Sequence, residues 1–144
     1  MSTISTSTTP QSTTAAGTRP FVVLCVCEGN SCRSPVAAVL LQQALGPEVE
    51  VASAGTRAVV GARVAPEMAA LLEGRSLSGG AFRARQLQPE HLRGAGLVLT
   101  MTQRQRAKAA SLVPAVVRWT FTLRELARLL TDVDPAALGS GPAR

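Results

Sequence analysis

The sequence predicts a single α/β domain built on a parallel β-sheet, and three observations carry that prediction. The chain has 144 residues, which is the length of one domain, and 46% of them are hydrophobic. Its first apolar run, residues 21–26, is continuous and rich in β-branched residues, as is typical of a strand buried on both faces. Strand-like and helix-like segments then alternate, which indicates parallel strands joined by right-handed crossovers.

The N-terminal segment has a composition of its own. Eleven of residues 1–20 are Ser or Thr, and Pro10, Gly17 and Pro20 interrupt them. Such a segment cannot bury enough apolar surface to offset the entropy lost on ordering. We therefore expect residues 1–20 to form a disordered tail and residues 21–144 to form the folded domain.

A Gly-containing loop and a helix follow the first strand. Ser34 is a favourable N-cap and Pro35 a favourable first helical residue, so we expect the helix to begin there and to end at Gly46. The side chains predicted to face the core are those of Val36, Val39, Leu40 and Ala44.

The later elements continue the alternation. A short strand at 49–52 precedes a loop at 55–64 and a helix at 66–73, whose inward residues we expect to be Met68, Leu71 and Leu72. A helical turn at 89–93, a strand at 96–101, a helix at 103–112 and a fourth strand at 116–119 come next. Thr122 and Glu125 have the spacing of a capping box, which predicts a helix from there to about residue 130.

Composition and charge limit the classes of function. Aromatic residues are only 3% of the chain, which argues against proteins that stack bases or sugars on rings. The net charge is +6 and 14 of the 15 basic residues are Arg, which suits phosphate oxyanions. No helix-turn-helix, finger or RNP motif supports a nucleic-acid partner. No apolar stretch has the length of a membrane span and no signal-peptide pattern is present, so we expect a cytoplasmic protein without a membrane partner. The oligomeric state is left open.

The three cysteines lie within eight residues of one another, at positions 25, 27 and 32. An odd number in such close spacing is a poor disulfide framework and favours a reducing compartment. Their spacing and the single histidine do not fit a zinc site, so neither a metal nor a cofactor is expected. Cys25, within the first strand, is expected to contribute to packing.

The segment with the pattern C-x5-R, residues 27–33, is the part of the chain that indicates chemistry. Its backbone N–H groups can curl inward in front of a helix N-terminus and form an anion cradle, with Gly29 allowing close approach and Asn30 a left-handed conformation. Arg33 can hold two phosphate oxygens, and a Cys27 thiolate, hydrogen-bonded by Ser34, can attack phosphorus. The remaining loop residues expected to bind substrate are Glu28, Ser31 and Cys32. The alternative is a helix entry with two buried cysteines.

The nine residues CEGNSCRSP, placed directly after an apolar strand, resemble the signature of low-molecular-weight protein tyrosine phosphatases. Residues 53–56, 84–87 and 97–101 extend the resemblance over about residues 21–122. It implies a flavodoxin-like three-layer sandwich with strand order 2-1-3-4. It also implies metal-free hydrolysis of a phosphorylated protein or small phosphomonoester through a phosphocysteine, with Cys27 as nucleophile, Arg33 as phosphate clamp, and Asn30 and Ser34 shaping the loop. Cys32 is then either a second thiol that can trap Cys27 in a disulfide or a small core-facing residue.

Several residues depart from the pattern that the resemblance implies. The family uses an Asp in a D-P-aromatic loop as general acid, and Asp134-Pro135 fits only the first two positions because Ala136 follows; the final helix of the family also has no counterpart here. Asp134 is therefore either the general acid or the end of the preceding helix, since a residue before Pro disfavours helix. A carboxylate at Glu28 would repel a dianionic substrate. The absence of aromatic residues in 55–64 weakens the case for tyrosine specificity.

Two other functions remain open at this level. An arsenate reductase of the same fold would use a similar loop with a small-thiol partner, because no cysteine after Cys32 could relay a disulfide. A phosphate-binding module with weak or no catalysis would keep the cradle and lack the acid, whose loss typically costs ~10²–10⁴ in rate. The basic residues of helix 103–112, namely Arg104, Arg106 and Lys108, either steer acidic partners or form a solvated face.

Overall fold

The computed structural model describes residues 19–138 and shows an α/β fold with one four-stranded sheet. Its strands are β1 (Phe21–Cys27), β2 (Val49–Gly55), β3 (Leu97–Thr100) and β4 (Thr120–Thr122), all parallel and in the order β2-β1-β3-β4. The predicted fold class and strand order are confirmed. Nearly all of the predicted tail, residues 1–18, and residues 139–144 lie outside the described part of the chain.

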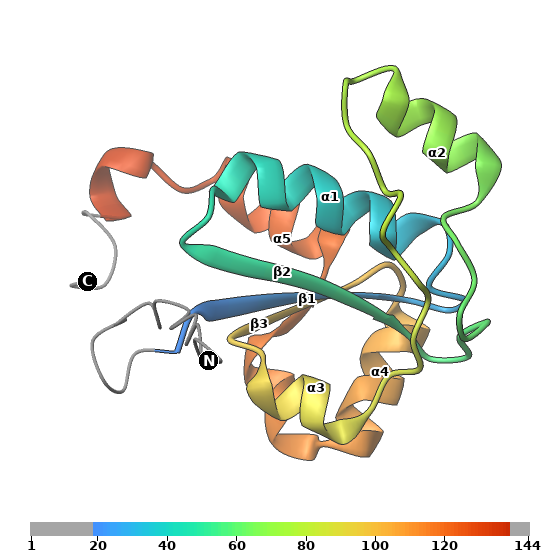
Figure 1. Cartoon of the computed structure of the whole chain (residues 1–144). Helices are drawn as coiled ribbons and strands as arrows, with labels where there is room; N and C mark the ends of the chain where they lie inside the picture. Colours follow the sequence, from blue (N-terminus) through green and yellow to red (C-terminus); the bar gives the residue numbers. More distant parts are fainter. Residues whose placement is uncertain (1–18, 139–144) are drawn as a thin grey trace, which may run out of the picture.

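Helices cover both faces of the sheet (Figure 1). The helices α1 (Arg33–Leu45) and α5 (Leu123–Thr131) lie on one face, and α3 (Pro89–Gly94) and α4 (Gln103–Leu112) lie on the other. The helix α2 (Pro66–Glu73) extends outward beyond α1, and two short 3-10 segments, η1 (Pro114–Trp119) and η2 (Pro135–Leu138), precede β4 and follow α5. Side chains of β1 alternate between two cores: Leu24 and Val26 pack with the α3–α4 layer, and Val23 and Cys25 with the α1–α5 layer.

The start of α1 differs from the prediction. The helix begins at Arg33 with Cys32 as its N-cap, so Ser34 and Pro35 lie inside the first turn and Ser34 is not the cap. The physical reason is that the Ser34 hydroxyl is hydrogen-bonded to Cys27 and Asn30 instead of to the helix backbone.

The faces predicted for two helices are also partly wrong. In α1, residues Ala37, Ala38 and Leu41 pack on the core, whereas Ala44 is exposed. This helix is apolar on nearly all sides, so the sequence pattern does not select a face. In α2, Leu72 is fully buried but Leu71 is 49% exposed.

The fourth strand lies later in the chain than predicted. Residues 116–119 belong to η1, which begins at Pro114, and the strand follows at Thr120–Thr122. Val116 is nevertheless fully buried, and its carbonyl accepts a hydrogen bond from Thr120 Oγ1 at 2.6 Å. The capping box is confirmed, because Glu125 N donates to Thr122 Oγ1 at 3.1 Å and Thr122 N donates to Glu125 Oε1 at 3.3 Å.

The side chain of Gln42 joins α1 to the outer edge of β2. Its Nε2 donates to the carbonyls of Val49 at 2.7 Å and Gly46 at 3.0 Å, and its Oε1 accepts from Val51 N at 2.9 Å. Because β2 is an edge strand, these bonds satisfy backbone groups that have no neighbouring strand. The contact fixes α1, and so the loop that leads into it, relative to the sheet.

Cys25 contributes to packing, as expected. Its side chain is fully buried, and burial together with the nearby Cys27 raises its pKa to about 12, so it remains an uncharged thiol. Within residues 19–138, no helix is long and apolar enough to cross a membrane. In the same part of the chain, no group of three or more His, Cys, Asp or Glu side chains is placed to hold a metal ion.

Candidate active site

The loop of residues 27–33 joins β1 to α1 at the carboxyl end of the sheet, where open parallel sheets bind ligands. Cys27 is the last residue of β1 and is only 2% exposed. Arg33 is the first residue of α1 and is exposed. The strand therefore fixes the thiol at the bottom of the loop, and the helix carries the guanidinium at its rim.

Two polar groups contact the Cys27 sulfur. The Ser34 Oγ lies 2.9 Å from Sγ, and the backbone N–H of Asn30 donates to Sγ at 3.3 Å. Both can stabilise negative charge on the sulfur, which is the charge that a nucleophilic or leaving thiolate carries.

Asn30 holds the loop in place. It is fully buried with φ of 55°, a left-handed conformation in which Asn is enriched. Its Nδ2 donates to Ser34 Oγ at 2.8 Å and to Ser53 Oγ at 3.0 Å, and its Oδ1 accepts from Arg85 N at 2.9 Å. One side chain thus ties the loop to α1, to β2 and to the segment before α3.

The carbonyl groups of the loop point outward. Those of four loop residues accept hydrogen bonds from backbone N–H groups in 56–65, pairing Cys27 with Thr56 (2.9 Å), Glu28 with Arg57 (2.9 Å), Gly29 with Val59 (3.2 Å) and Ser31 with Ala65 (2.8 Å). Because C=O and N–H point to opposite sides of a planar trans peptide, the N–H groups that follow these carbonyls turn inward. Successive inward N–H groups form a concave anion site.

Gly55, at the end of β2, allows the loop to lie against the sheet. A Cβ at this position would be 2.5 Å from the Glu28 carbonyl oxygen and 2.9 Å from both the N and the Cβ of Asn30. Its own backbone is bound on both sides, since Gly55 N donates to Arg85 O at 3.0 Å and Leu87 N donates to Gly55 O at 2.8 Å. The position therefore requires a glycine for lack of space.

A depression of about 550 Å³ opens in front of the loop, and we call it the mouth. The predicted residues Glu28 and Arg33 line it, together with Thr56, Arg57, Thr102, Arg104, Gln105 and Lys108. Glu28 Oε1 lies 3.9 Å from Arg57 Nη1, and both side chains are well exposed, so this ion pair contributes about 0–1 kcal/mol. For Arg104, Arg106 and Lys108 the sequence favours a solvated face over a role in steering acidic partners. In the structure Arg104 and Lys108 line the mouth, whereas Arg106 Nε donates to the Thr120 carbonyl at 3.1 Å.

The structure does not bring Asp134 to the loop. The chain enters α5 at the carboxyl end of β4, and the segment after α5, drawn in red in Figure 1, lies at the opposite end of the sheet. The Asp134 side chain is exposed, and its Oδ1 accepts from Ala136 N at 2.9 Å. Cys32 is half-buried and occupies the N-cap position of α1, within the 27–33 loop.

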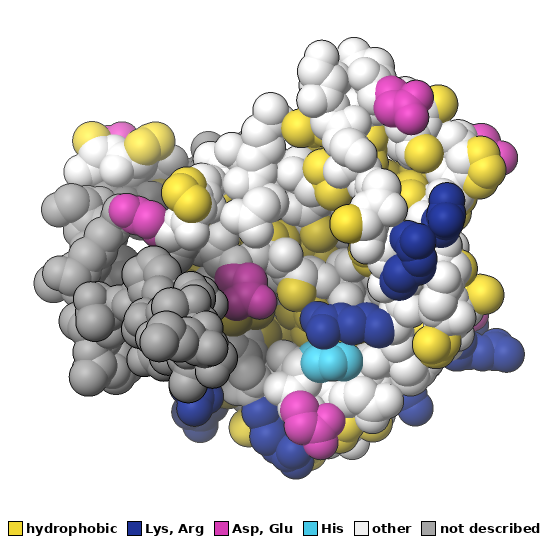
Figure 2. Space-filling model, viewed as in Figure 1, with side chains coloured by type: hydrophobic (Ala, Val, Ile, Leu, Met, Phe, Trp, Pro, Cys, Tyr) yellow, Lys and Arg dark blue, Asp and Glu magenta, His cyan; other side chains and the backbone are white. Residues whose placement is uncertain are grey.

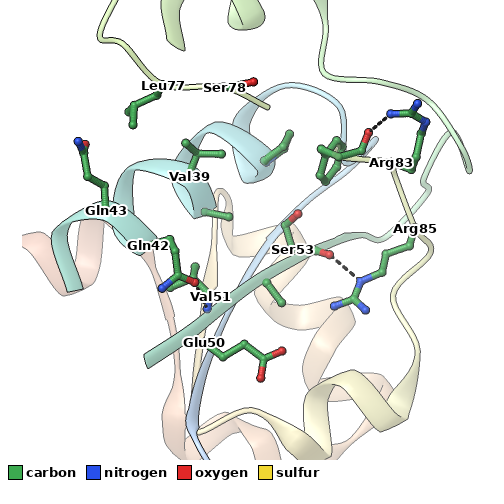
Figure 3. A pocket seen from close by; sticks show the side chains of 14 residues that line it. Val39, Gln42, Gln43, Glu50, Val51, Ser53, Leu77, Ser78, Arg83 and Arg85 are labelled. Atoms are coloured by element: carbon green, nitrogen blue, oxygen red, sulfur yellow. Dashed lines mark hydrogen bonds between the residues drawn. The ribbon is translucent and has the colours of Figure 1, made fainter. Parts of the chain in front are cut away.

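A second hollow, of about 630 Å³, lies between α1, β2 and residues 77–85. Figure 2 shows hydrophobic side chains in this hollow over α1 and β2. Cys27 and Arg33 are not among its lining residues. In Figure 3, Arg85 reaches the carbonyl oxygen of Ser53, where its Nε donates at 2.9 Å. The same figure shows Arg83 turned back onto a backbone carbonyl, that of Phe82 at 2.6 Å. Ser53 and Arg85, which are hydrogen-bonded to Asn30, thus also line this hollow.

Comparison with known proteins relates this site to a family. A family model described as low molecular weight phosphotyrosine protein phosphatase matches residues 22–135. The chain is 37% identical to a protein-arginine-phosphatase of Geobacillus stearothermophilus, over 85% of this chain and 82% of the relative. It is 39% identical to the low molecular weight protein-tyrosine-phosphatase Wzb of Salmonella typhi, over 64% of this chain and 61% of the relative.

Solved structures agree with the sequence comparison. The YwlE arginine phosphatase from Geobacillus stearothermophilus superposes with a TM-score of 0.71 and 37% identity, covering 85% of this chain and 79% of that one. The tyrosine phosphatase amsI of Erwinia amylovora superposes with a TM-score of 0.68 and 32% identity, covering 74% of this chain and 70% of that one.

Proposed function

Because the chain belongs to the low molecular weight phosphotyrosine protein phosphatase family, we propose that it hydrolyses tyrosine phosphate in proteins with Cys27 as the nucleophile. The observation that carries this proposal is the placement of a buried thiol at the bottom of a loop in which four carbonyls are turned outward. Cys27 is 2% exposed, and Ser34 Oγ and Asn30 N lie 2.9 Å and 3.3 Å from its sulfur. No step of the proposed reaction uses a metal ion or a cofactor.

In the first step, the inward N–H groups of the loop and the Arg33 guanidinium hold the non-bridging phosphate oxygens. The Cys27 thiolate attacks phosphorus from the side opposite the tyrosine oxygen. A P–S bond forms and the P–O bond to tyrosine breaks, and the phenolic oxygen leaves with the bonding electron pair. The product is a phosphocysteine in the same loop.

In the second step, water attacks the phosphocysteine. A new P–O bond forms, the P–S bond breaks and the sulfur leaves as thiolate, while the water loses a proton and inorganic phosphate is released. Ser34 Oγ, 2.9 Å from the sulfur, is placed to stabilise this leaving thiolate. The Asn30 side chain acts by positioning, because its amide binds Ser34 and does not contact the phosphate in our proposal.

Phosphoarginine is a second candidate substrate. It is favoured by the similarity to a protein-arginine-phosphatase that extends over 85% of this chain. The same loop can hold the phosphoryl group of either residue, since its donors contact only the phosphoryl oxygens. The side chain beyond phosphorus therefore decides between them, and only the mouth contacts it.

Arsenate reduction is the weaker alternative. The relatives described above are named phosphatases. Only a version with a small-thiol partner stays open, because the sequence has no cysteine after Cys32 that could relay a disulfide. We propose a reducing, cytoplasmic setting, because the mechanism needs a free thiol and all three cysteines are free.

The experiment compares wild-type protein with Cys27→Ser on an aryl phosphate, a phosphotyrosine peptide and a phosphoarginine peptide. We expect a fall in kcat of at least about 10³-fold, as is typical when a nucleophile is removed, and a phosphocysteine trapped by rapid acid quench and seen by mass spectrometry in the wild type. Cys25→Ala is the matched control, because Cys25 packs in the core and has no role in the reaction. Activity that survives Cys27→Ser would overturn the mechanism, and phosphate binding without turnover would identify a binding module.

A further inference from the structure

The mouth is strongly cationic, and its charges come from three separate segments. Arg33 lies at the start of α1, Arg57 in the loop after β2, and Arg104 and Lys108 on α4. Arg104 and Lys108 are four residues apart, so they lie on the same face of their helix. The helix α4 begins just after β3, at the same end of the sheet as the 27–33 loop, and this brings its first turns to the mouth.

Two basic residues of α4, Arg104 and Lys108, are unfavourable for the helix that carries them. Arg104 is the second residue of α4, next to the positive end of the helix dipole, and no acidic residue lies in that first turn. Lys108 repels it from one turn further on. Residues that break local rules without a local compensation are expected where they serve a site. The depression in front of the 27–33 loop is that site here.

Other residues of the mouth offset only part of this charge. Glu28 is the acidic residue that lines the mouth, and it faces Arg57. Thr102 and Gln105 are occupied in capping α4, where Thr102 Oγ1 accepts from Gln105 N at 3.3 Å and Gln105 Oε1 accepts from Thr102 N at 3.1 Å. Arg104 and Lys108 thus remain directed at whatever enters the mouth.

We propose that Arg104 and Lys108 form a second anion subsite, which binds a carboxylate of an Asp or Glu residue beside the phosphorylated residue of a protein substrate. The inference rests on the phosphatase function proposed above. In that function the phosphoryl oxygens are bound by the loop N–H groups and Arg33, which leaves the two α4 cations free for another negative group. Acidic phosphopeptides are then the preferred substrates.

The first test uses the unaltered protein. The values of kcat/KM are compared for two phosphotyrosine peptides that differ only in having Asp and Glu, or Asn and Gln, beside the phosphotyrosine. We expect about a fivefold preference for the acidic peptide at low salt, as follows from two exposed charge pairs, and its decline towards unity at about 0.5 M NaCl. Turnover of an aryl phosphate without any preference for the acidic peptide would overturn this inference alone. If the unaltered protein does not turn over the aryl phosphate at all, the proposed function is overturned instead.

The second test removes the subsite with the double variant Arg104→Gln/Lys108→Gln. We expect the acidic-to-neutral ratio of kcat/KM to fall to near one. Arg93→Gln is the control; Arg93 is exposed on α3, which precedes β3 and so lies at the other end of that strand. This variant removes a positive charge without touching the mouth and should keep the wild-type ratio. An unchanged ratio in the double variant, or an equal loss in Arg93→Gln, would refute a defined subsite.

Discussion

Replacing Gly55 by Ala should displace the 27–33 loop and lower the activity, although no residue of the loop itself is altered. The added Cβ would lie 2.5 Å from the Glu28 carbonyl oxygen and 2.9 Å from the backbone N of Asn30. Real Cβ atoms essentially never approach another heavy atom below 3.0 Å, so the loop or the strand must move by at least half an ångström. The atoms in the way are mainly backbone, and Gly55 itself is hydrogen-bonded to Arg85 and Leu87, so neither side can yield easily.

The expected cost follows from these contacts. Overpacking of this kind destabilises a fold by about 1–3 kcal/mol. The displaced residues carry the inward N–H groups, and a misplacement of about 1 Å can cost about 10²-fold in rate, so we expect kcat/KM for an aryl phosphate to fall at least tenfold. The assay pairs steady-state kinetics with urea unfolding, which separates a distorted site from an unfolded protein.

Gly94→Ala is the matched control for this substitution. Gly94 ends α3 and an added Cβ would meet nothing within 4 Å, so the variant should keep both its activity and its stability. Gly55→Ala with kcat/KM within about twofold of the wild type would show that the close approach of β2 to the loop has no part in catalysis. A loss of stability with unchanged activity in the folded fraction would lead to the same conclusion.

Three further outcomes are expected. Asn30→Ala removes the three hydrogen bonds of a fully buried side chain and should lower the free energy of unfolding in urea by about 2–4 kcal/mol, whereas a change below about 1 kcal/mol would show that Asn30 does not hold the loop in place. Asp134→Asn should change kcat by less than about twofold for aryl phosphates with good and poor leaving groups alike, and a selective loss with poor leaving groups would make Asp134 the general acid. His91 accepts from Gln88 N through Nδ1 and so must be neutral, and burial and then Arg85 lower its pKa from 6.5. Stability should therefore be full above about pH 6.5 and fall as the pH drops below it, and His91→Gln should flatten this dependence in urea titrations between about pH 5 and 7.5.

The features that could be predicted from the sequence depend on neighbouring residues. The strand at the start of the domain is marked by a run of β-branched residues, and the helix after β4 by the spacing of Thr122 and Glu125. The loop is marked by the interval between Cys27 and Arg33 together with the strand before it. In each case the physical cause lies within about ten residues of the chain.

The features that could not be predicted depend on contacts between distant segments. The steric role of Gly55 arises because the loop crosses it, and the outward carbonyls are satisfied by residues about 30 positions later. The core-facing side of α1 is decided by packing, since its sequence is apolar on most sides. The run at 116–119 fits a strand as well as it fits η1, and only the register of β4 with β3 separates the two.

The bond between Gln42 and β2 has a consequence for how the molecule behaves among copies of itself. An edge strand presents a row of unpaired backbone groups that can template pairing with another chain. Here the Gln42 amide takes up both Val51 N and Val49 O, which a foreign strand would need. Gln42→Ala would expose these groups in the first half of a seven-residue strand. Gln42 therefore protects the edge strand from intermolecular β-association. Its loss would appear as aggregation during refolding at high concentration.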